Sequence, residues 1–507
     1  MLGGYDAVAL EWSAPDSVVP ALLALPIIAP LLVAVAAALA GWRRSIGWVT
    51  VWASVIIGLD GVATSLATVD GSVLTAGPLR ADALSAVMLL VVGVVAVVAT
   101  WAGVYHVDAE VRAGRTTPAQ TRTFGVGVSV FLAASSVAVS AGSLAMLWIA
   151  VEAMTVATAA LIGSAGTRAA WEAKWKFVVI TSVGLAMAGL GTVLVYVAAG
   201  NGAASEHRSS DWAYLAEHAD LLDPGVLRIA FPLLLIGFGT AAGLVPLHSW
   251  LPDAHGQAPA PVSALMSGCL LAVAVYALLR CHRVVTVGLG EGFVRALLLA
   301  VALASLAVAV SMLIVQRDYM RLLAYSSMQY MAVAVFGLAI GTPIAVAAVL
   351  LHLLGHGLGK AVLFCGAGQI SACEGSTEFD GLRGMLTRHP AAAGVSVLAL
   401  AALLGFPPFS PFASMHTLVN AGMGSGLVAA TAVAAAAVIV LFIVIAARVT
   451  PMFFSSASPV AGAPAVTADR LQTVPLVLGL TGLALLGIFV FPLHDLLTTA
   501  GAIVVAR

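Results

Sequence analysis

The stretch GFGTAAGLVPLHSWLPDAHGQAPAPVSALMSG, residues 237–268, decides how this chain must fold. It lies between two apolar segments, yet it holds four prolines and three titratable residues, namely Pro246, Pro252, Pro259, Pro261, His248, Asp253 and His255. Proline interrupts a helix because it lacks a backbone N–H. Broken helix is tolerated inside a membrane only where protein shields it or where it lines a wet cavity. The stretch therefore indicates a path for an ion or a substrate.

The composition of the whole chain defines its class. Of its 507 residues, 61% are hydrophobic and only 9% are charged, and the mean hydropathy is +1.08. So few charged side chains cannot cover a protein surface against water. The chain is therefore predicted to be a polytopic membrane protein whose main solvent is the lipid bilayer. The net charge of −1 and the absence of a basic run argue against a nucleic-acid partner.

The cysteines and the amino terminus exclude further classes. Cys269, Cys281, Cys365 and Cys373 form no C-x-x-C pair, so iron–sulfur, zinc and redox-dithiol sites find no support. We therefore expect no cofactor, no metal and no redox centre in this chain. The amino terminus lacks a basic region, so a cleaved signal peptide is not expected.

Apolar segments long enough to span a bilayer recur from end to end. They fall at 19–41, 46–69, 83–106, 123–141, 143–164, 176–199, 227–246, 259–280, 292–315, 322–341, 343–371, 391–421, 427–448 and 472–497. This pattern predicts an all-α fold with about fourteen transmembrane helices.

The distribution of Lys and Arg predicts the orientation. With the amino terminus outside, the cytoplasmic loops receive Arg43, Arg44, Arg112, Arg115, Arg122, Arg168, Lys174, Arg317, Arg321, Arg383, Arg388, Arg448 and Arg470. The outer side receives Arg80, Arg208, Arg228, Arg280, Arg283, Arg295 and the acidic loop 200–226. This excess of cytoplasmic cations fits the positive-inside rule.

A second interruption resembles the first. The segment GFPPFSPFAS, residues 405–414, contains Pro407, Pro408 and Pro411 about 160 residues after the first break. Interrupted helices at matching positions predict two inverted five-helix repeats. The chain then divides into amino-terminal helices at 1–122, a first repeat at 123–280, a second repeat at 281–450, and a carboxy-terminal loop and last helix at 451–507. The segment 455–468 is expected to be a short loop.

Two charged residues near the first repeat are candidates for proton transfer. Glu152 is the only acid in the helical segment MLWIAVEAMTVATAALIG, and an intramembrane acid is by default functional. The alternative is a structural ion pair or hydrogen bond between helices. Lys176 begins the sixth predicted span, and its alternative is a lysine that reaches toward the interface.

His352, His356 and Lys360 recur every four residues in HLLGHGLGK, which places them on one helix face. Three titratable groups, each about 6 Å from the next along the helix, can pass protons through intervening water. A metal site is an alternative, but no third ligand is evident. Helix packing is another, and the intervening glycines suit either close packing or a water-filled gap.

The first break adds His248, which follows Pro246 and is the better candidate for a path residue. Asp253 has a strong alternative as a helix cap. Gln329 and Tyr330 are candidates for polar contacts between helices.

Taken together, these motifs resemble the antiporter-like membrane subunits of respiratory complex I, of Mrp sodium/proton antiporters and of energy-conserving hydrogenases. The resemblance covers about 120–420. It is carried by P-L-H-x-W-L-P-D-A-H, A-P-x-P-V-S-A and Y-A-L-L-R within 237–280, W-I-A-x-E-A at 148–153, E-A-x-W-K at 172–176, H-x-x-x-H-x-x-x-K at 352–360 and G-x-P-P-F at 405–409. It is greatest to the hydrogenase-4 component F and formate hydrogenlyase type.

The resemblance implies fourteen helices, a line of buried charges at mid-membrane, and movement of protons, or of sodium in some members, coupled to redox chemistry in partner subunits. Its acid, sixth-helix lysine and eleventh-helix row correspond to Glu152, Lys176 and His352, His356 and Lys360. The family's usual lysine before the first break is Ala241 here, its eighth-helix positions are Ser267 and Val273, and its charge after the second break is Met415, next to His416. The central Glu–Lys pair is therefore incomplete.

Three hypotheses follow. The first is a non-redox, proton-translocating subunit of a hydrogenase-type or complex I-type oxidoreductase, partnered by other membrane and peripheral subunits. The second is a degenerate subunit that scaffolds the membrane arm, which Ala241 and Met415 favour. The third is a cation/proton antiporter or a module for inorganic-carbon uptake.

Overall fold

The computed structural model describes residues 15, 17–200, 211–456, 470–489 and 491–505. The long helices are α1 (Val19–Ala40), α2 (Arg44–Thr68), α3 (Ala83–Arg112), α4 (Pro118–Val139), α5 (Leu144–Gly163), α6 (Arg168–Ala198), α8 (Pro224–Ala241), α12 (Glu291–Val315), α13 (Tyr319–Ile340), α14 (Pro343–Glu374) and α18 (Val428–Phe454), together with a continuous unit of α10 (Ala260–Leu265), the π-helix η2 (Met266–Leu270) and α11 (Leu271–Leu289). The shorter elements are β1 (Leu74–Ala76), β2 (Leu79–Ala81), α7 (Trp212–Glu217), η1 (Ala219–Leu221), α9 (Leu251–Gln257), α15 (Met385–Arg388), α16 (Pro390–Leu403), α17 (Ser410–Gly424), η3 (Arg470–Gln472), α19 (Val474–Ile488) and α20 (Phe491–Val505).

The predicted class is confirmed, because nearly all of the described chain is helical and 12 of its helices are long and apolar enough to cross a membrane. The two other predicted windows correspond to helices in pieces. The window 391–421 holds α16 and α17 with a break between them, and the window 472–497 holds α19 and the beginning of α20. The short antiparallel hairpin of β1 and β2 was not predicted from the sequence.

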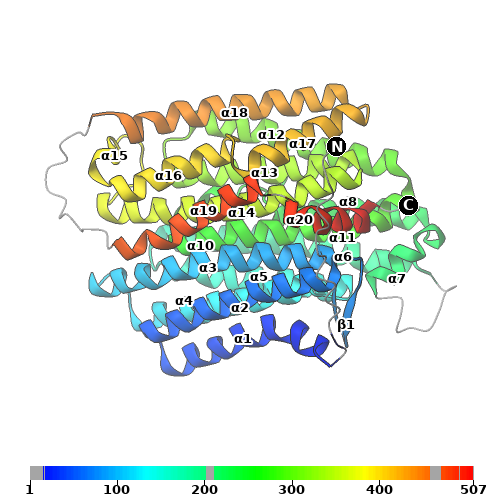
Figure 1. Cartoon of the computed structure of the whole chain (residues 1–507), viewed down its shortest axis with the longest axis horizontal. Helices are drawn as coiled ribbons and strands as arrows, with labels where there is room; N and C mark the ends of the chain where they lie inside the picture. Colours follow the sequence, from blue (N-terminus) through cyan, green and yellow to red (C-terminus); the bar gives the residue numbers. More distant parts are fainter. Residues whose placement is uncertain (1–14, 16, 201–210, 457–469, 490, 506–507) are drawn as a thin grey trace, which may run out of the picture.

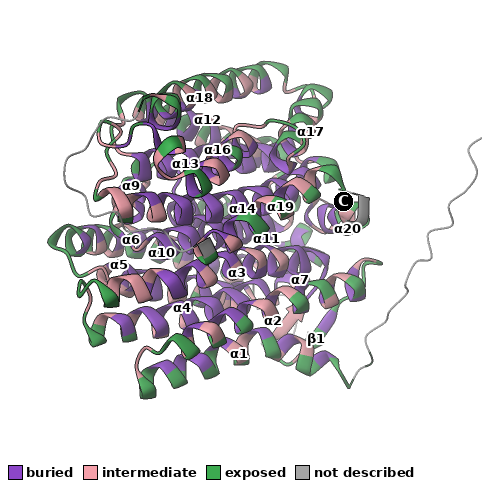
Figure 2. Cartoon of the chain, turned by 60° about the vertical axis from the view of Figure 1, so that its left-hand side comes forward, coloured by how far each residue is buried: buried purple, intermediate pink, exposed green. Residues whose placement is uncertain are grey.

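The helices lie side by side, along the horizontal direction of Figure 1. Figure 2 shows α14, α11 and α3 as the buried centre, whereas α1 and α18 lie at opposite edges and expose much of their surface. The exposed residues of these edge helices are apolar, for example Leu39 on α1 and Ile439 on α18. Such a surface matches the hydrocarbon core of a bilayer.

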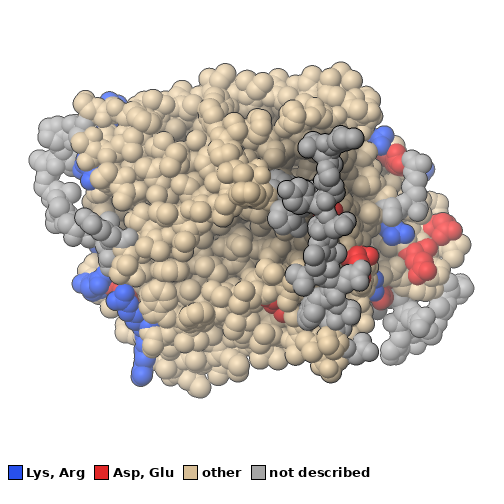
Figure 3. Space-filling model, viewed as in Figure 1, with Lys and Arg blue, Asp and Glu red and all other residues tan. Residues whose placement is uncertain are grey.

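The two ends of the helix stack differ in charge. In Figure 3 the left-hand end carries mainly Lys and Arg, whereas the right-hand end carries most of the Asp and Glu in view together with several Lys and Arg. The basic end includes the α1–α2 and α3–α4 turns, and the acidic end includes α7 with Asp211 and Glu217. Among the described residues, the two ends therefore differ mainly in their share of acidic side chains.

The two ends of the central helix α14 are set by signals in its sequence. The Thr342 side chain accepts a hydrogen bond from the backbone N–H of Ala345, and Pro343 occupies the first turn, where no N–H is needed. Gly375 ends the helix in the left-handed conformation with a φ of 69°. The 32 residues between these signals cross the whole stack, so one helix presents side chains at every depth.

Glycines let neighbouring helices approach α14. A Cβ atom on Gly357 would lie 3.1 Å from the carbonyl oxygen of Gly268 in η2 and 2.9 Å from Val95 in α3. A Cβ atom on Gly355 would lie 2.6 Å from the Ser410 hydroxyl at the start of α17. The glycines between the histidines therefore serve close packing, which was one of the two interpretations open from the sequence.

A saturated ionic cluster anchors the acidic end. The guanidinium group of Arg280 on α11 donates two hydrogen bonds of 2.7 Å to the carboxylate of Asp82. It also donates to the hydroxyls of Tyr276 and Ser85, each at 2.8 Å, and lies 4.2 Å from the Trp212 ring centre. Both charged side chains are 2% exposed. Arg280 is thus near the predicted outer side but inside the protein.

Some predictions concern residues outside the described ranges. These are the uncleaved amino terminus, the outer-loop residues Glu206 and Arg208, and most of the loop 455–468. The division into repeats at 123–280 and 281–450 stays a prediction.

Candidate functional site

The predicted row on α14 is fully buried. His352, His356 and Lys360 are each 0% exposed, and they face α13, η2 and α17. Their spacing of one turn follows from helix geometry, as the sequence indicated. Three titratable side chains therefore lie in the interior of the protein, about midway between its two charged ends.

Lys360 is held by uncharged acceptors. Its Nζ atom donates a hydrogen bond of 2.7 Å to the backbone carbonyl of Leu323 and another to the hydroxyl of Ser326, both on α13. The ion pairs formed by described residues do not include Lys360. A buried ammonium without a carboxylate is costly to keep charged, so this lysine is suited to gain and lose a proton.

The two histidines share Tyr330, a residue that the sequence identified only as a polar contact. The Tyr330 ring lies 4.6 Å from the His352 ring and 4.7 Å from the His356 ring, between centroids. Nε2 of His356 lies 3.5 Å from the Ser267 hydroxyl, which contacts Ser327 at 2.8 Å. On each histidine one ring nitrogen is buried and has no hydrogen-bond partner: Nε2 of His352 and Nδ1 of His356. These free nitrogens can bind a proton or a water molecule.

The ends of the row reach both broken helices. Nδ1 of His352 lies 3.1 Å from the hydroxyl of Ser414 on α17, just beyond the second break. At the other end, the rings of His255 and Phe364 lie 5.3 Å apart, and Lys360 lies 5.9 Å from the same Phe364 ring. His255 also interacts electrostatically with Lys360. We call this series of side chains between α9 and α17 the polar line; within it, the Phe364 ring lies near both His255 and Lys360.

His255 is a site residue that the sequence reasoning named without selecting. It is 0% exposed, its Nδ1 contacts the Leu251 carbonyl at 2.9 Å, and its Nε2 has no partner. His248, which was preferred, lies half-buried in the loop between α8 and α9 with an unpaired Nδ1. The sequence of α9 does not reveal which helix His255 faces. Only the tertiary structure places His255 beside the row.

The first break lies between Ala241, the end of α8, and Ala260, the start of α10. Two hydrogen bonds hold the connecting backbone: the indole N–H of Trp250, within the break, donates to the Thr240 carbonyl of α8 at 3.0 Å, and the N–H of Val245 donates to the Ser305 hydroxyl of α12 at 3.1 Å. Pro246 lies on the exposed side of this loop. The break therefore sits where the sequence predicted it, with its backbone groups partly satisfied by side chains.

The second break separates α16 from α17 at 404–409 and contains Pro407 and Pro408. Met415, at the position where the resemblance implies a charge, is partly buried among apolar side chains that line a cavity of about 240 Å³. The adjacent His416 instead contacts Asn420 at 3.0 Å. On this side of the break, the group that contacts the row is therefore the neutral hydroxyl of Ser414 and not a charged side chain.

Glu152 and Lys176 do not pair in this structure. Lys176 forms an ion pair with Asp253 at 2.5 Å, and Arg321 binds the other oxygen of the same carboxylate at 2.8 Å. Asp253 thus joins α6, α9 and α13, and no capping hydrogen bond from its side chain is formed in α9. Glu152 is half-buried, and its Oε2 atom is buried without a partner. The acid candidate is therefore free of a counter-ion, as the alanine at 241 suggested.

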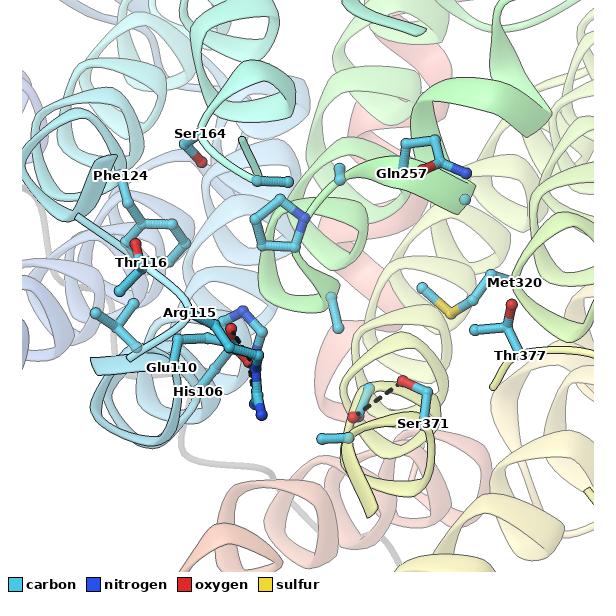
Figure 4. A pocket seen from close by; sticks show the side chains of 18 of the residues that line it. His106, Glu110, Arg115, Thr116, Phe124, Ser164, Gln257, Met320, Ser371 and Thr377 are labelled. Carbon is cyan, nitrogen blue, oxygen red and sulfur yellow. Dashed lines mark hydrogen bonds and ion pairs between the residues drawn. The ribbon is translucent and has the colours of Figure 1, made fainter. Parts of the chain in front are cut away.

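A polar pocket of about 700 Å³ opens at the basic end (Figure 4). Figure 4 shows His106, Glu110 and Arg115 on one wall and Ser371 and Thr377 across from them. Arg115 donates hydrogen bonds of 3.0 and 2.7 Å to Glu110. The floor includes Gly256, next to His255, and Gly368 on α14. Gly368 is two turns, or about 12 Å, beyond Lys360.

The alternative function of His352 and His356 is a metal site, which would need a third ligand nearby. Within the ranges that the structure describes, no three His, Cys, Asp or Glu side chains gather closely enough to hold a metal ion.

Fold and site together define a polytopic membrane protein with two interrupted helices and a buried polar line between them. A family model described as NADH:quinone oxidoreductase/Mrp antiporter, TM, matches residues 141–443, and the chain belongs to this family. The family resemblance drawn from the motifs is thereby confirmed.

Individual relatives agree with this assignment. The chain is 34% identical over 315 residues to a hydrogenase-4 component F homolog of Methylacidiphilum infernorum, covering 62% of this chain and 66% of that protein. It is 33% identical over 279 residues to NADH-quinone oxidoreductase subunit N of Desulforudis audaxviator, covering 55% and 54%. The chain thus spans less than two thirds of either relative.

Among solved structures, a chain of the membrane-bound sulfane sulfur reductase, described as an archaeal respiratory membrane complex, superposes with a TM-score of 0.84. The match covers 96% of this chain and 98% of that one, at 22% identity. At this identity the likeness establishes the fold.

Proposed function

We propose that this chain is a proton-translocating membrane subunit of a hydrogenase-type or complex I-type assembly, with the redox chemistry carried out by partner subunits. The observation that carries the proposal is the row of fully buried titratable side chains His352, His356 and Lys360 on α14. Ser414 contacts His352 at one end of the row, and the Phe364 ring lies near both Lys360 and His255 at the other. Titratable groups inside a membrane protein are costly and mark proton relays. The relatives named as hydrogenase and NADH-quinone oxidoreductase subunits support the choice of assembly.

The polar pocket supplies the entrance in this proposal. It is lined by His106, Glu110 and Arg115 and reaches Gly256 beside His255. Water molecules bridge the remaining distance of about two helix turns to Lys360. Lys360 then exchanges its proton with His356 and His352, whose unpaired ring nitrogens are available. Ser414 passes the proton toward the second break.

The orientation and the repeats belong to the same proposal. The basic end with the pocket faces the cytoplasm, which leaves the amino terminus outside, in agreement with the positive-inside rule. The blocks 123–280 and 281–450 act as two inverted repeats, each with one broken helix. Lys176 and Asp253 join the first break to α6 and so position His255. Glu152 holds a proton on the side of the first repeat.

The test compares two lysines in the assembled complex. We expect Lys360→Ala to lower substrate-driven proton uptake into inverted membrane vesicles on the order of 100-fold, as for loss of a proton-transfer group. Lys174→Ala is the matched control, because Lys174 lies at the basic end against the rings of Trp171 and Trp175. Subunit assembly is measured in parallel by blue-native electrophoresis. Equal proton uptake in the two variants would contradict the proposal.

A second candidate function is a scaffold that conducts little. Ala241 and Met415, in place of the charges that the family resemblance implies, favour it. In that case Lys360→Ala reduces the amount of assembled complex and leaves proton uptake per complex unchanged, so the same experiment separates the two functions. Exchange of sodium for protons without redox substrate would instead indicate an antiporter.

A further inference from the structure

Asp60 is a buried acid that the line on α14 does not use. It is the only acidic residue of α2, and it lies outside the family-matched region 141–443. It is 4% exposed, and both oxygens of its carboxyl group are buried without a hydrogen-bond partner. The sequence offered the same signal as for Glu152, a lone acid in an apolar span, but Asp60 was not singled out.

Close backbone packing holds α2 in place around this residue. A Cβ atom on Gly61 would lie 2.8 Å from the backbone nitrogen of Leu90 on α3, and one on Gly93 would lie 2.4 Å from the Cα atom of Gly58. With α2 pressed against α3 on both sides of Asp60, the short aspartate side chain cannot reach the water at either end. Its carboxyl group stays at this depth.

Thr64 lies one turn further along the same face. It is 0% exposed, and its Oγ1 atom also lacks a hydrogen-bond partner. Thr50 and Ser54, on the same helix, instead donate to their own helix carbonyls four residues earlier. Asp60 and Thr64 are thus adjacent polar groups whose hydrogen-bonding capacity is unused.

Helix α1 has backbone carbonyls without helical donors at about the same depth as Asp60. Val19 and Leu23 of α1 cluster with Ala67 of α2, so in this antiparallel pair Asp60 is level with Pro26 to Pro30. Pro26 and Pro30 lie inside α1 and have no N–H, which leaves the carbonyls of Leu22 and Pro26 without their helical donors. A carbonyl can accept a hydrogen bond from a protonated carboxyl group, whereas it repels a carboxylate.

Among the residues that the structure describes, Asp60 forms no ion pair. Helix α1 contains no titratable residue, and the charged residues of α3 and α4 lie within the last two turns of α3 and the first two turns of α4. The carboxyl group and Thr64 supply three side-chain oxygens, fewer than the six or more that Mg²⁺ or Ca²⁺ takes.

We propose that Asp60, together with Thr64, is a second proton-binding site, located in the α1–α2 hairpin and separate from the line on α14. The bound ligand is one proton, which converts the carboxylate to a carboxylic acid. Two further hydroxyls lie toward the basic end, about 9 Å along α2 from Asp60: Ser54 lies 3.2 Å from the Thr100 hydroxyl, and Thr100 lines a cavity of about 10 Å³ that also touches Pro261 of α10. The proposed site exchanges its proton with water on this side.

Infrared spectroscopy of the whole complex in membranes tests the proposal. The difference spectrum between wild type and Asp60→Asn should contain the carbonyl band of a protonated carboxylic acid, and this band should shift in heavy water because the proton exchanges. Asp253→Asn is the control, since Asp253 is ion-paired and should give only carboxylate bands. Carboxylate bands for Asp60, or a band that heavy water does not shift, would overturn the proposal.

Chemical labelling of the unaltered protein covers the case in which Asp60→Asn does not assemble. Dicyclohexylcarbodiimide is an apolar reagent that modifies protonated carboxyl groups inside membranes. We expect the label on the peptide that contains Asp60 and not on the peptide that contains Asp253. Protection of Asp60 by sodium chloride, but not by potassium chloride, would show that the site binds a metal cation and would overturn the assignment to a proton.

Discussion

Two buried polar clusters in this molecule differ in how completely their atoms are paired. At the acidic end, the carboxylate of Asp82 receives two hydrogen bonds from Arg280, which also donates to Tyr276 and Ser85. In the row on α14, Lys360 contacts only neutral acceptors, and His352 and His356 each keep an unpaired ring nitrogen. Both clusters are buried to the same extent.

This difference separates a structural role from a transfer role. A fully paired ion cluster loses much if either partner changes its charge, so it fixes α3 against α11. A row with unused donor and acceptor positions can gain or lose a proton without breaking an ion pair. Burial alone therefore does not identify a proton carrier, whereas burial with incomplete pairing does.

The largest effect is expected from breaking the paired cluster. Arg280→Ala leaves the Asp82 carboxylate buried and unpaired, and we expect a loss of about 3–5 kcal/mol of stability. Thermal unfolding of the purified protein in nanodiscs measures it, with Arg168→Ala at an exposed ion pair as the control. The double variant Arg280→Met with Asp82→Leu should recover most of the loss. A stable Arg280→Ala protein would remove the distinction between the clusters.

Glu152→Gln tests the unpaired acid on α5. The amide keeps the shape of the side chain but cannot release a proton, so we expect proton uptake into vesicles to fall on the order of 100-fold while assembly is preserved. Glu172→Gln is the matched control, because Glu172 lies exposed beside Arg168. Unchanged uptake in Glu152→Gln would assign this acid to the structural class.

His356→Gln should have a smaller effect on proton uptake. Glutamine can still contact Ser267, but it cannot carry a proton, and water can bypass one position in the row. We expect uptake to fall roughly tenfold, equivalent to about 1.4 kcal/mol in the barrier. His282→Gln, a buried histidine outside the row, is the control. Similar losses in both variants would indicate that any buried histidine is needed for packing.

The smallest effect is expected at the second break. Ser414→Ala removes one hydrogen bond to His352, a contribution of about 0.5–1.5 kcal/mol, so uptake should fall a few-fold. Ser410→Ala is the control, because the Ser410 hydroxyl is buried nearby without a partner. If Ser410→Ala lowers proton uptake as much as Ser414→Ala or more, protons do not leave the row through Ser414.

Local sequence information was sufficient for the long helices and the positions of the two breaks. Long apolar windows predicted the helices, prolines predicted the breaks at 243–261 and 405–414, and four-residue spacing placed His352, His356 and Lys360 on one face. It was less informative for windows that divide into short helices, such as α16 and α17, because hydropathy does not register a turn of six residues. It also missed the hairpin of β1 and β2.

The pairing of charges depended on contacts between distant segments. Nothing local distinguishes Lys176 as a partner of Asp253, 77 residues later, from a partner of Glu152. The same holds for His255, whose place beside Phe364 and Lys360 follows from the packing of α9 on α14. The sequence named Lys176, Asp253 and His255 as ionisable groups, but it could not decide which of them meet.

By itself, then, the sequence determined that this protein is a membrane protein, that two of its helices are broken and that a histidine–lysine row lies on one helix face. These features follow from hydropathy, proline and the helical period, which act over a few residues. The tertiary structure alone decided which buried charges are neutralised, as at Asp82, and which are left unpaired, as at Glu152 and Asp60. The physical reason is that the energy of a buried charge is set by the groups within a few ångströms, and in a helical membrane protein those groups come from other helices.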